Sequence, residues 1–412
     1  MNTPQYIERG SKSYYRANWA LFFAGFVTFS TLYDFQPLFP DIAREFSLSP
    51  AMASLCLSFA TGALAFTLPI SGSLSDALGR RLLMGTAVIL TSLLTFAAAG
   101  SHTLPLLLAL RLLQGIVLAG VPAVAMAYLS EEIEPQSLGR AMGLYIAGNA
   151  MGGMTGRILT AAVNDYTSWR TAVHCIGLIS LLLSLLFLFL LPRSRNFQRR
   201  PLHLVKLSAS LLSHLKNPGL LCLFGVAFAC MGGFVTLYNY VTFRLLGPDF
   251  ALSQTHVALI FLAYAFGAFG SSFMGSLACR FGRSMILFTS LAVMASGLIL
   301  TIFQVLPLVI VGIVIFTIGF FGAHAVASAW VGVLAGHSRG QASSLYLFAY
   351  YMGSSISGTG GGFIYSRWGW SGVTLLILML IGAAALAGLR LASLTQWNKA
   401  DEFTQGLVPQ SR

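Results

Sequence analysis

Long apolar runs recur along the whole chain, and they constrain its fold more than any other feature. A helix that crosses a lipid bilayer needs about 20 mostly apolar residues, and the runs have this length. They predict an all-α integral membrane protein with twelve transmembrane helices. The predicted spans are residues 17–39, 51–72, 82–100, 103–130, 138–163 and 169–191, then 218–246, 254–278, 284–303, 305–334, 339–365 and 370–393.

The composition agrees with a protein whose exterior faces lipid. Charged residues make up 9% of the chain, against about 25% in a typical soluble domain, and the mean hydropathy is +0.78. The net charge of +12 would suit nucleic-acid binding, but the basic residues lie between the apolar runs and form no patch. We therefore expect a lipid bilayer as the surroundings and no nucleic-acid partner.

The basic residues also predict an orientation. If the N-terminus is cytoplasmic, 18 of the 24 Lys and Arg residues fall in cytoplasmic segments or at the cytoplasmic ends of spans, and four in outer loops or at outer span ends. Because Lys and Arg collect on the cytoplasmic side, both termini are expected inside. We expect no cleavable signal peptide, since the first apolar run is long enough to stay as an anchor.

The longest polar interval, residues 192–217, divides the chain. It predicts an N-terminal six-helix bundle at 1–191, a cytoplasmic linker at 192–217 and a C-terminal six-helix bundle at 218–394. Residues 395–412 form a tail whose end resembles an altered protease site, so we interpret it as an expression remnant and exclude it from functional reasoning.

The two halves repeat each other, as in a duplicated transporter. Glycine, arginine and tryptophan at fixed offsets are harder to attribute to chance than apolar matches. At an offset of 203, the matches are Gly72, Gly79 and Arg80 with Gly275, Gly282 and Arg283. At an offset of 201, they are Gly139, Tyr145, Gly152 and Trp169 with Gly340, Tyr346, Gly353 and Trp370.

The loop after the second predicted span carries the strongest motif, which reads Gly72-Ser-Leu-Ser-Asp76-Ala-Leu-Gly79-Arg80-Arg81. It resembles the signature G-x-L-[SA]-D-x-x-G-R-[RK] of the major facilitator superfamily at every defined position. The glycines allow a tight turn, and the acid and the arginines can form charge pairs that break when the cytoplasmic side opens. The resemblance, which covers residues 14–392, implies a cytoplasmic gate and alternating access by two pseudo-symmetric six-helix bundles.

Two further motifs resemble the drug:proton antiporter branch of this superfamily. Span four carries Arg111 in the context Leu-Ala-Leu-Arg-Leu-Leu-Gln-Gly, whose arginine the resemblance associates with proton coupling. Span five carries glycines at 148, 152, 153 and 156, but departs from the antiporter motif at Gly153 and at Arg157. Small residues there still predict close helix packing, while the departure weakens an inference of antiport from this motif alone.

Buried charges indicate a site for coupling. Asp34 is the only acid well inside a predicted span, and Arg111 and Arg157 lie at a similar depth, about 9 Å from the outer helix ends. Our hypothesis is that Asp34 binds and releases the coupling proton, with a nearby Arg111 favouring its ionised form. The alternative is a purely structural Asp34–Arg111 ion pair. His324, in span ten, is either a proton relay or a structural histidine.

Polar and aromatic side chains in the inward spans predict a substrate cavity suited to amphipathic or aromatic solutes. At each position, helix packing is the alternative. The candidates are Tyr33, Gln36, Asn149, Arg157, Tyr238, Asn239, Tyr346 and Tyr350.

These patterns predict a monomeric secondary transporter of the bacterial inner membrane, with a small-molecule substrate and protons as partners. The first hypothesis is proton-coupled efflux of amphipathic molecules, as in multidrug resistance. The second is an importer or exchanger of small organic anions or sugars, because two buried arginines and one aspartate leave a formal charge of +1. A membrane-embedded enzyme or scaffold is a third. We expect no cofactor, metal or disulfide, since the five cysteines are scattered and none forms a CxxC pair.

Overall fold

The computed structural model describes residues 6–199, 204–336 and 339–405, and all regular elements in these ranges are helices. One isolated bridge pairs Ile7 with Ile133. The end of the tail, which the sequence analysis interprets as an expression remnant, lies outside the described residues.

The chain forms two compact units, and their division differs from that of the two sequence halves. The first unit contains residues 1–204 together with 235–264 and 354–373, and the second contains 205–234, 265–353 and 374–412. Segments from the second half of the sequence therefore pack with the N-terminal helices. The predicted domains at 1–191 and 218–394 follow the repeat in the sequence. That they move as two rigid bodies during transport stays a prediction.

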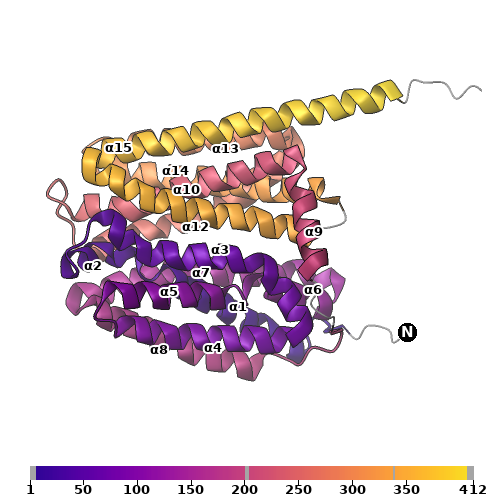
Figure 1. Ribbon diagram of the computed structural model, residues 1–412, viewed down its shortest axis with the longest axis horizontal. Coiled ribbons are helices and arrows are strands. Elements are labelled where there is room, and N and C mark those ends of the chain that lie inside the picture. Colours follow the sequence, from indigo (N-terminus) through magenta and orange to yellow (C-terminus); the bar gives the residue numbers. More distant parts are fainter. Residues whose placement is uncertain (1–5, 200–203, 337–338, 406–412) are drawn as a thin grey trace, which may run out of the picture. The chain divides into compact units, whose positions relative to one another are not determined.

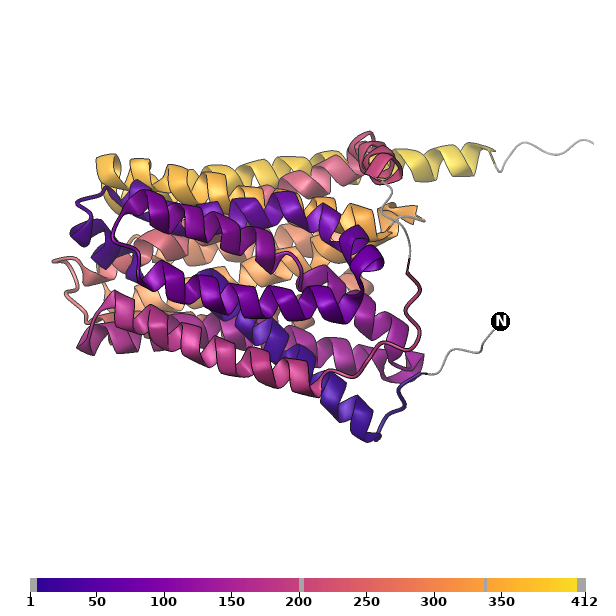
Figure 2. The same cartoon turned by 60° about the horizontal axis from the view of Figure 1, so that its bottom comes forward.

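In the first unit, the long N-terminal helices run side by side in both ribbon views (Figures 1 and 2). Ser11, Ser49 and Ser168 cap three of them by accepting a hydrogen bond from a backbone N–H in the first turn. The elements are α1 (Lys12–Tyr33), η1 (Gln36–Leu38), α2 (Phe39–Glu45), α3 (Pro50–Leu78), α4 (Arg80–Ala99), α5 (Leu104–Leu118), α6 (Pro122–Glu132), α7 (Pro135–Tyr166) and α8 (Trp169–Leu190).

The glycines of the span-five motif bring α7 against α1. A Cβ atom added at Gly148 would lie 2.4 Å from the carbonyl oxygen of Phe22, and one at Gly152 would lie 2.3 Å from that of Phe26. Gly156 meets Ser30 in the same way, with 2.7 Å to its Cα. Because both rows advance by four residues, the backbone of α1 lies along the groove that the glycines leave on α7. The motif therefore has a packing role.

The remaining helices come from the second half of the sequence. Gly369 has φ 60° and ψ −149° within α15, a conformation open only to glycine, so this element consists of two helices joined at one residue. The elements are α9 (Leu204–Leu215), α10 (Pro218–Leu246), α11 (Gln254–Ala258), η2 (Leu259–Leu262), α12 (Ala263–Phe281), α13 (Arg283–Leu300), α14 (Leu306–Leu334) and α15 (Arg339–Gln405).

In the second unit, α10 and α15 repeat the close approach of α1 and α7. A Cβ atom at Gly353 would lie 2.1 Å from the carbonyl oxygen of Phe228. Gly353 matches Gly152 at the offset of 201 found in the sequence, so the repeat extends to the packing of helices.

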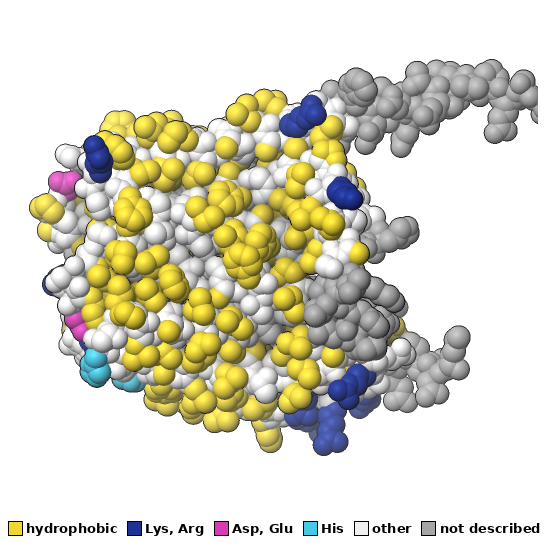
Figure 3. Space-filling view, viewed as in Figure 1, with side chains coloured by type: hydrophobic (Ala, Val, Ile, Leu, Met, Phe, Trp, Pro, Cys, Tyr) yellow, Lys and Arg dark blue, Asp and Glu magenta, His cyan; other side chains and the backbone are white. Residues whose placement is uncertain are grey.

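Nine helices in the described residues are long and apolar enough to cross a membrane. They include neither α1 nor α7, and α15 counts once although Gly369 divides it. The prediction of twelve spans therefore stays a prediction. On the face in Figure 3, hydrophobic side chains cover the middle of the helices and charged side chains lie toward their ends.

Some predicted boundaries are wrong. Span 17–39 ends as a helix at Tyr33, because the chain then turns through η1, where Pro37 occupies the first turn. The bounds of span 103–130 agree with the candidate span Leu104–Glu132, but its helix is interrupted at residues 119–121, because Pro122 has no N–H to donate within a continuous helix and starts α6 instead.

Candidate functional site: a buried charge cluster and its gates

Arg111 on α5 is fully buried and joins three helices. Its guanidinium donates to the carbonyl oxygens of Thr31 at 2.9 Å, Leu32 at 2.6 Å and Cys56 at 2.7 Å. The first two belong to the last turn of α1, where carbonyls lack helical partners. Gln114, three residues further along α5, accepts another hydrogen bond at 2.5 Å. Arg111 therefore satisfies the end of α1 and ties it to α3.

Asp34 caps the end of α1 and is also fully buried. Its Oδ1 accepts a hydrogen bond from the Phe35 backbone N–H at 2.9 Å and lies 3.3 Å from the Arg111 guanidinium. Its Oδ2 is buried and has no hydrogen-bond partner among the described residues. An ionised oxygen without a donor is costly in such a place, and a proton on it lowers that cost. The ion pair thus engages only one of the two carboxylate oxygens of Asp34.

Arg157 on α7 is 1% exposed and lies among aromatic rings. Its guanidinium carbon is 4.0 Å from the ring centroid of Tyr33, 5.1 Å from that of Phe261 and 4.9 Å from that of Tyr264. Its Nε donates to Gln36 Oε1 at 2.6 Å. None of the ion pairs in the described part of the chain includes Arg157, so rings and neutral oxygens hold its charge.

The Gln36 side chain extends this cluster to α10. It donates to Asn239 Oδ1 at 2.7 Å. The neighbouring Tyr238 ring stacks on Phe261 at 5.4 Å, and Phe261 in turn faces Arg157. The structure therefore brings together five of the predicted cavity residues, Tyr33, Gln36, Arg157, Tyr238 and Asn239, beside Asp34 and Arg111.

Asn149 lies elsewhere, two turns along α7. Its Oδ1 would be 2.1 Å from a Cβ atom at Gly25, so it packs at the crossing of α7 and α1.

The other candidates belong to the second unit. His324 Nδ1 lies 2.9 Å from the Tyr346 hydroxyl, and its ring is 4.8 Å from that of Tyr350. The three residues form one aromatic cluster on α14 and α15, which Phe320 joins by stacking on His324 at 6.2 Å. The direct contacts of His324 are therefore to tyrosines and a phenylalanine.

The gate motif forms a charged turn. Gly79 has φ +103° between α3 and α4, a conformation that glycine adopts without strain. The Arg80 guanidinium lies 2.6 Å from Asp76 and 2.6 Å from Glu131 on α6. Arg81 instead donates to the Leu188 carbonyl at 2.9 Å. Since Asp76, Arg80 and Glu131 all belong to the N-terminal half, these pairs fix the loop within that half.

Segments of the second half meet the N-terminal helices at the end that the basic residues assign to the outer side, here called the predicted outer end. Gln254 donates to Asp41, and the Thr255 hydroxyl donates to Asp165 at 2.6 Å. Deeper along α3, Thr61 and Ser355 share a hydrogen bond at 2.7 Å. All these residues lie in the first unit, so hydrogen bonds join the segments of the second half to the N-terminal helices there.

Sequence reasoning missed several partners. Gln114 lies one turn from Arg111, and Glu131 is one of two adjacent acids at the end of α6; both could have been found from spacing. Phe261 and Tyr264 gave no signal, because aromatics are common in spans. No group of three or more His, Cys, Asp or Glu in the described residues has the arrangement of a metal site.

Comparisons with known proteins show the family to which the chain belongs. The Major Facilitator Superfamily matches residues 21–247 and 224–405. The chain belongs to this superfamily. It is 44% identical over 398 residues to the MFS-type transporter YybF of Bacillus subtilis, covering 96% of this chain and 98% of that one. It is 43% identical over 387 residues to the inner membrane transport protein YnfM of Escherichia coli, covering 94% of this chain and 93% of that one.

A solved structure shares the fold. It is a bacterial homolog of the human lysosomal transporter Spinster, with a TM-score of 0.76, 16% identity and coverage of 94% of this chain and 99% of that one. The protein is thus a membrane transporter of the superfamily, acting on a small molecule, and not an enzyme.

Proposed function

We propose that the protein exports amphipathic small molecules across the bacterial inner membrane in exchange for protons. The observation that carries this proposal is Asp34, a fully buried carboxylate with one oxygen bound and one without a donor. In this arrangement one proton changes the charge of the cluster, and Arg111 is placed to respond, because its guanidinium lies 3.3 Å away.

The rings around Arg157 support an amphipathic substrate. Tyr33, Tyr238 and Tyr264 combine apolar faces with hydroxyl groups, and they come from both halves of the sequence. In the proposal, these residues separate when the predicted outer end opens, and a substrate taken up from the cytoplasmic side is then released from the rings to the outside.

Proton coupling is tested with Asp34→Asn, which keeps the acceptor for the Phe35 N–H but cannot ionise. Purified protein in proteoliposomes is given a pH gradient, and a panel of amphipathic cations and neutral drugs is screened, alongside susceptibility of an efflux-deficient strain. We expect wild type to transport compounds in exchange for protons when the pH gradient is applied. In Asp34→Asn, the transport rate should no longer depend on the pH gradient. Glu45→Gln, which removes an acid at the surface, is the matched control and should transport normally. Gradient-independent transport by wild type would contradict the proposal.

A second function, uptake or exchange of small organic anions, is favoured by one observation. Arg111, Arg157 and an ionised Asp34 sum to a formal charge of +1, and Arg157 has no acid partner among the described ion pairs. A substrate that carries a carboxylate would neutralise that positive charge. Transport of benzoate-like anions by wild type, lost in Arg157→Gln and kept in Arg157→Lys, would establish this function in place of drug export.

A further inference from the structure

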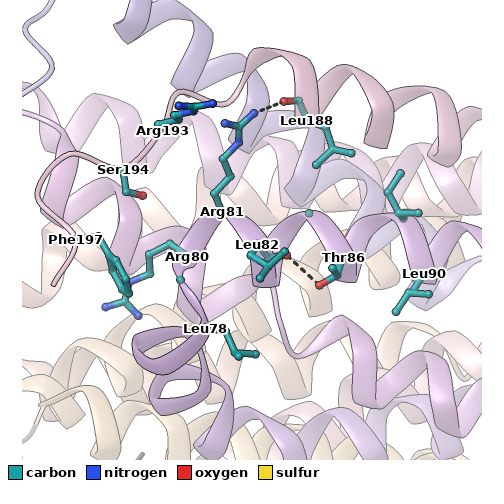
Figure 4. A pocket seen from close by; sticks show the side chains of 13 residues that line it. Leu78, Arg80, Arg81, Leu82, Thr86, Leu90, Leu188, Arg193, Ser194 and Phe197 are labelled. Atoms are coloured by element: carbon teal, nitrogen blue, oxygen red, sulfur yellow. Dashed lines mark hydrogen bonds between the residues drawn. The ribbon is translucent and has the colours of Figure 1, made fainter. Parts of the chain in front are cut away.

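A pocket of about 780 Å³ opens at the other end of the first unit, away from the charge cluster. Figure 4 shows it between the start of α4, the end of α8 and the segment that follows α8. The pocket is lined by Gly79, Arg80 and Arg81 of the gate motif, and by no residue of the predicted substrate cavity. Its lining residues fall into an apolar group on the helices and a basic group at one end.

The apolar group faces the region that a bilayer would occupy. Leu82 is 58% exposed and Leu90 46% exposed on α4, two turns apart. Between them, the Thr86 hydroxyl is satisfied by the Leu82 carbonyl at 3.0 Å, so it does not call for a polar ligand. Leu188 of α8 forms the opposite side. The groove has the direction and chemistry of an acyl chain lying along α4.

The basic group contains arginines without acid partners. Arg80 is occupied by Asp76 and Glu131. Arg81 bonds only a neutral carbonyl, that of Leu188, and Arg193 is exposed on the segment after α8. None of the ion pairs in the described ranges includes Arg81 or Arg193. Figure 3 shows Lys and Arg side chains gathered at this end of the helices. The two charges are therefore available to an anion.

Two more features at the same end favour an anion. The 20-residue helix α4 begins here, and its N-cap Gly79 offers no side chain to bond the first N–H groups. Ser194 lines the pocket, and its Oγ is buried without a hydrogen-bond partner among the described residues. A hydroxyl group, a helix N-terminus and two guanidinium groups without an acid partner among the described ion pairs thus lie beside an apolar groove.

We propose that this pocket binds an anionic phospholipid. Its phosphate lies at Arg81, Arg193 and the start of α4, and one acyl chain follows Leu82, Thr86 and Leu90. A free phosphate would leave the apolar groove empty, and an uncharged lipid would leave both arginines unpaired. Because Arg81 follows Arg80 directly, the bound lipid holds the gate loop to the end of α8.

Native mass spectrometry of the full-length protein in detergent tests this site. Dioleoyl phosphatidylglycerol and dioleoyl phosphatidylcholine are added in equal amounts, so that only the headgroup differs. We expect phosphatidylglycerol to be retained preferentially. The double variant Arg81→Gln/Arg193→Gln keeps the hydrogen-bonding groups and should lower this preference by about fivefold per arginine. The control Arg9→Gln/Arg140→Gln removes two charges outside the pocket and should leave the preference unchanged.

A second variant tests the apolar half of the site. Thr86→Trp fills the groove and leaves the charges intact, so it should also reduce phosphatidylglycerol binding, while millimolar inorganic phosphate should not displace the lipid. The proposal is overturned if the lipids bind equally, if the two double variants behave alike, or if phosphate displaces the lipid and Thr86→Trp has no effect. A thermal unfolding scan of each variant excludes misfolding as the cause.

Discussion

The two repeated loops of the chain share a backbone but not a charge pattern. Gly79 and Gly282 occupy the same place before α4 and α13, with φ +103° and +92°. In the first loop, Arg80 pairs with Asp76 and Glu131. In the second, Cys279 stands where the first has Asp76, and none of the ion pairs in the described ranges includes Arg283.

The same contrast holds inside the helices. Gly152 and Gly353 make equivalent close contacts, but Arg157 corresponds to Gly358 at the same offset of 201. Duplication has thus kept the glycines that set backbone geometry, because a side chain there has no space. Arg157 has a glycine as its counterpart, so the repeated helix crossing forms without a charge at this position.

The largest effect is expected at Arg111, which has no counterpart in the second half. Arg111→Ala removes a donor from three buried carbonyls and the ion-pair partner of buried Asp34, and should cost about 3–5 kcal/mol of unfolding free energy. Thermal unfolding in detergent measures this, with Arg283→Ala as the exposed control, expected within about 0.5 kcal/mol. Equal losses of unfolding free energy in the two variants would show that the buried contacts of Arg111 do not stabilise the fold.

Next come the repeated glycines, where the halves should behave alike. Gly152→Ala and Gly353→Ala each place a Cβ atom against a backbone carbonyl, at 2.3 and 2.1 Å, and should each cost about 1–3 kcal/mol. Gly275→Ala is the control, because no atom lies within 4 Å of its Cβ position. Unfolding experiments on the three variants measure this. A loss of unfolding free energy in only one of Gly152→Ala and Gly353→Ala would show that the two crossings are not equivalent.

A smaller, asymmetric effect is expected in the loops. Arg80→Gln removes two ion pairs with partly exposed acids and should cost about 1 kcal/mol, together with slower transport. Arg283→Gln removes no described ion pair and should alter neither quantity. Transport rates in proteoliposomes, compared at equal protein density, decide this. A slower Arg283→Gln would mean that the second loop also acts through charge.

The smallest effect concerns pH at the predicted outer end. Burial opposes ionisation of Glu45, but hydrogen bonds from Arg170 and Trp169 outweigh it, so the pKa of Glu45 lies below its usual value. A lowered pKa in the folded state gives stability that is present above pH 4.5 and is lost as the pH falls through the folded pKa. The Tm should fall less on acidification in Glu45→Gln than in wild type. Parallel curves would remove Glu45 from the pH response.

Much of the architecture follows from the sequence alone. Apolar runs specify helices because a bilayer leaves no other way to satisfy backbone groups. Gly79 marks a turn because its conformation suits glycine, and the repeat at fixed offsets anticipates the equivalent helix crossings. These features depend on residues close together in the chain, or on periodicity, and both can be read without coordinates.

Only the tertiary structure decided how the charges are used. The sequence suggested that Asp34 and Arg111 lie near each other. It did not suggest that Arg111 donates most of its hydrogen bonds to the carbonyls of Thr31, Leu32 and Cys56. Nor did it suggest the rings around Arg157. Such contacts depend on the register between helices far apart in the chain, and a shift of one residue, about 100° of rotation in an α-helix, would replace every one of them.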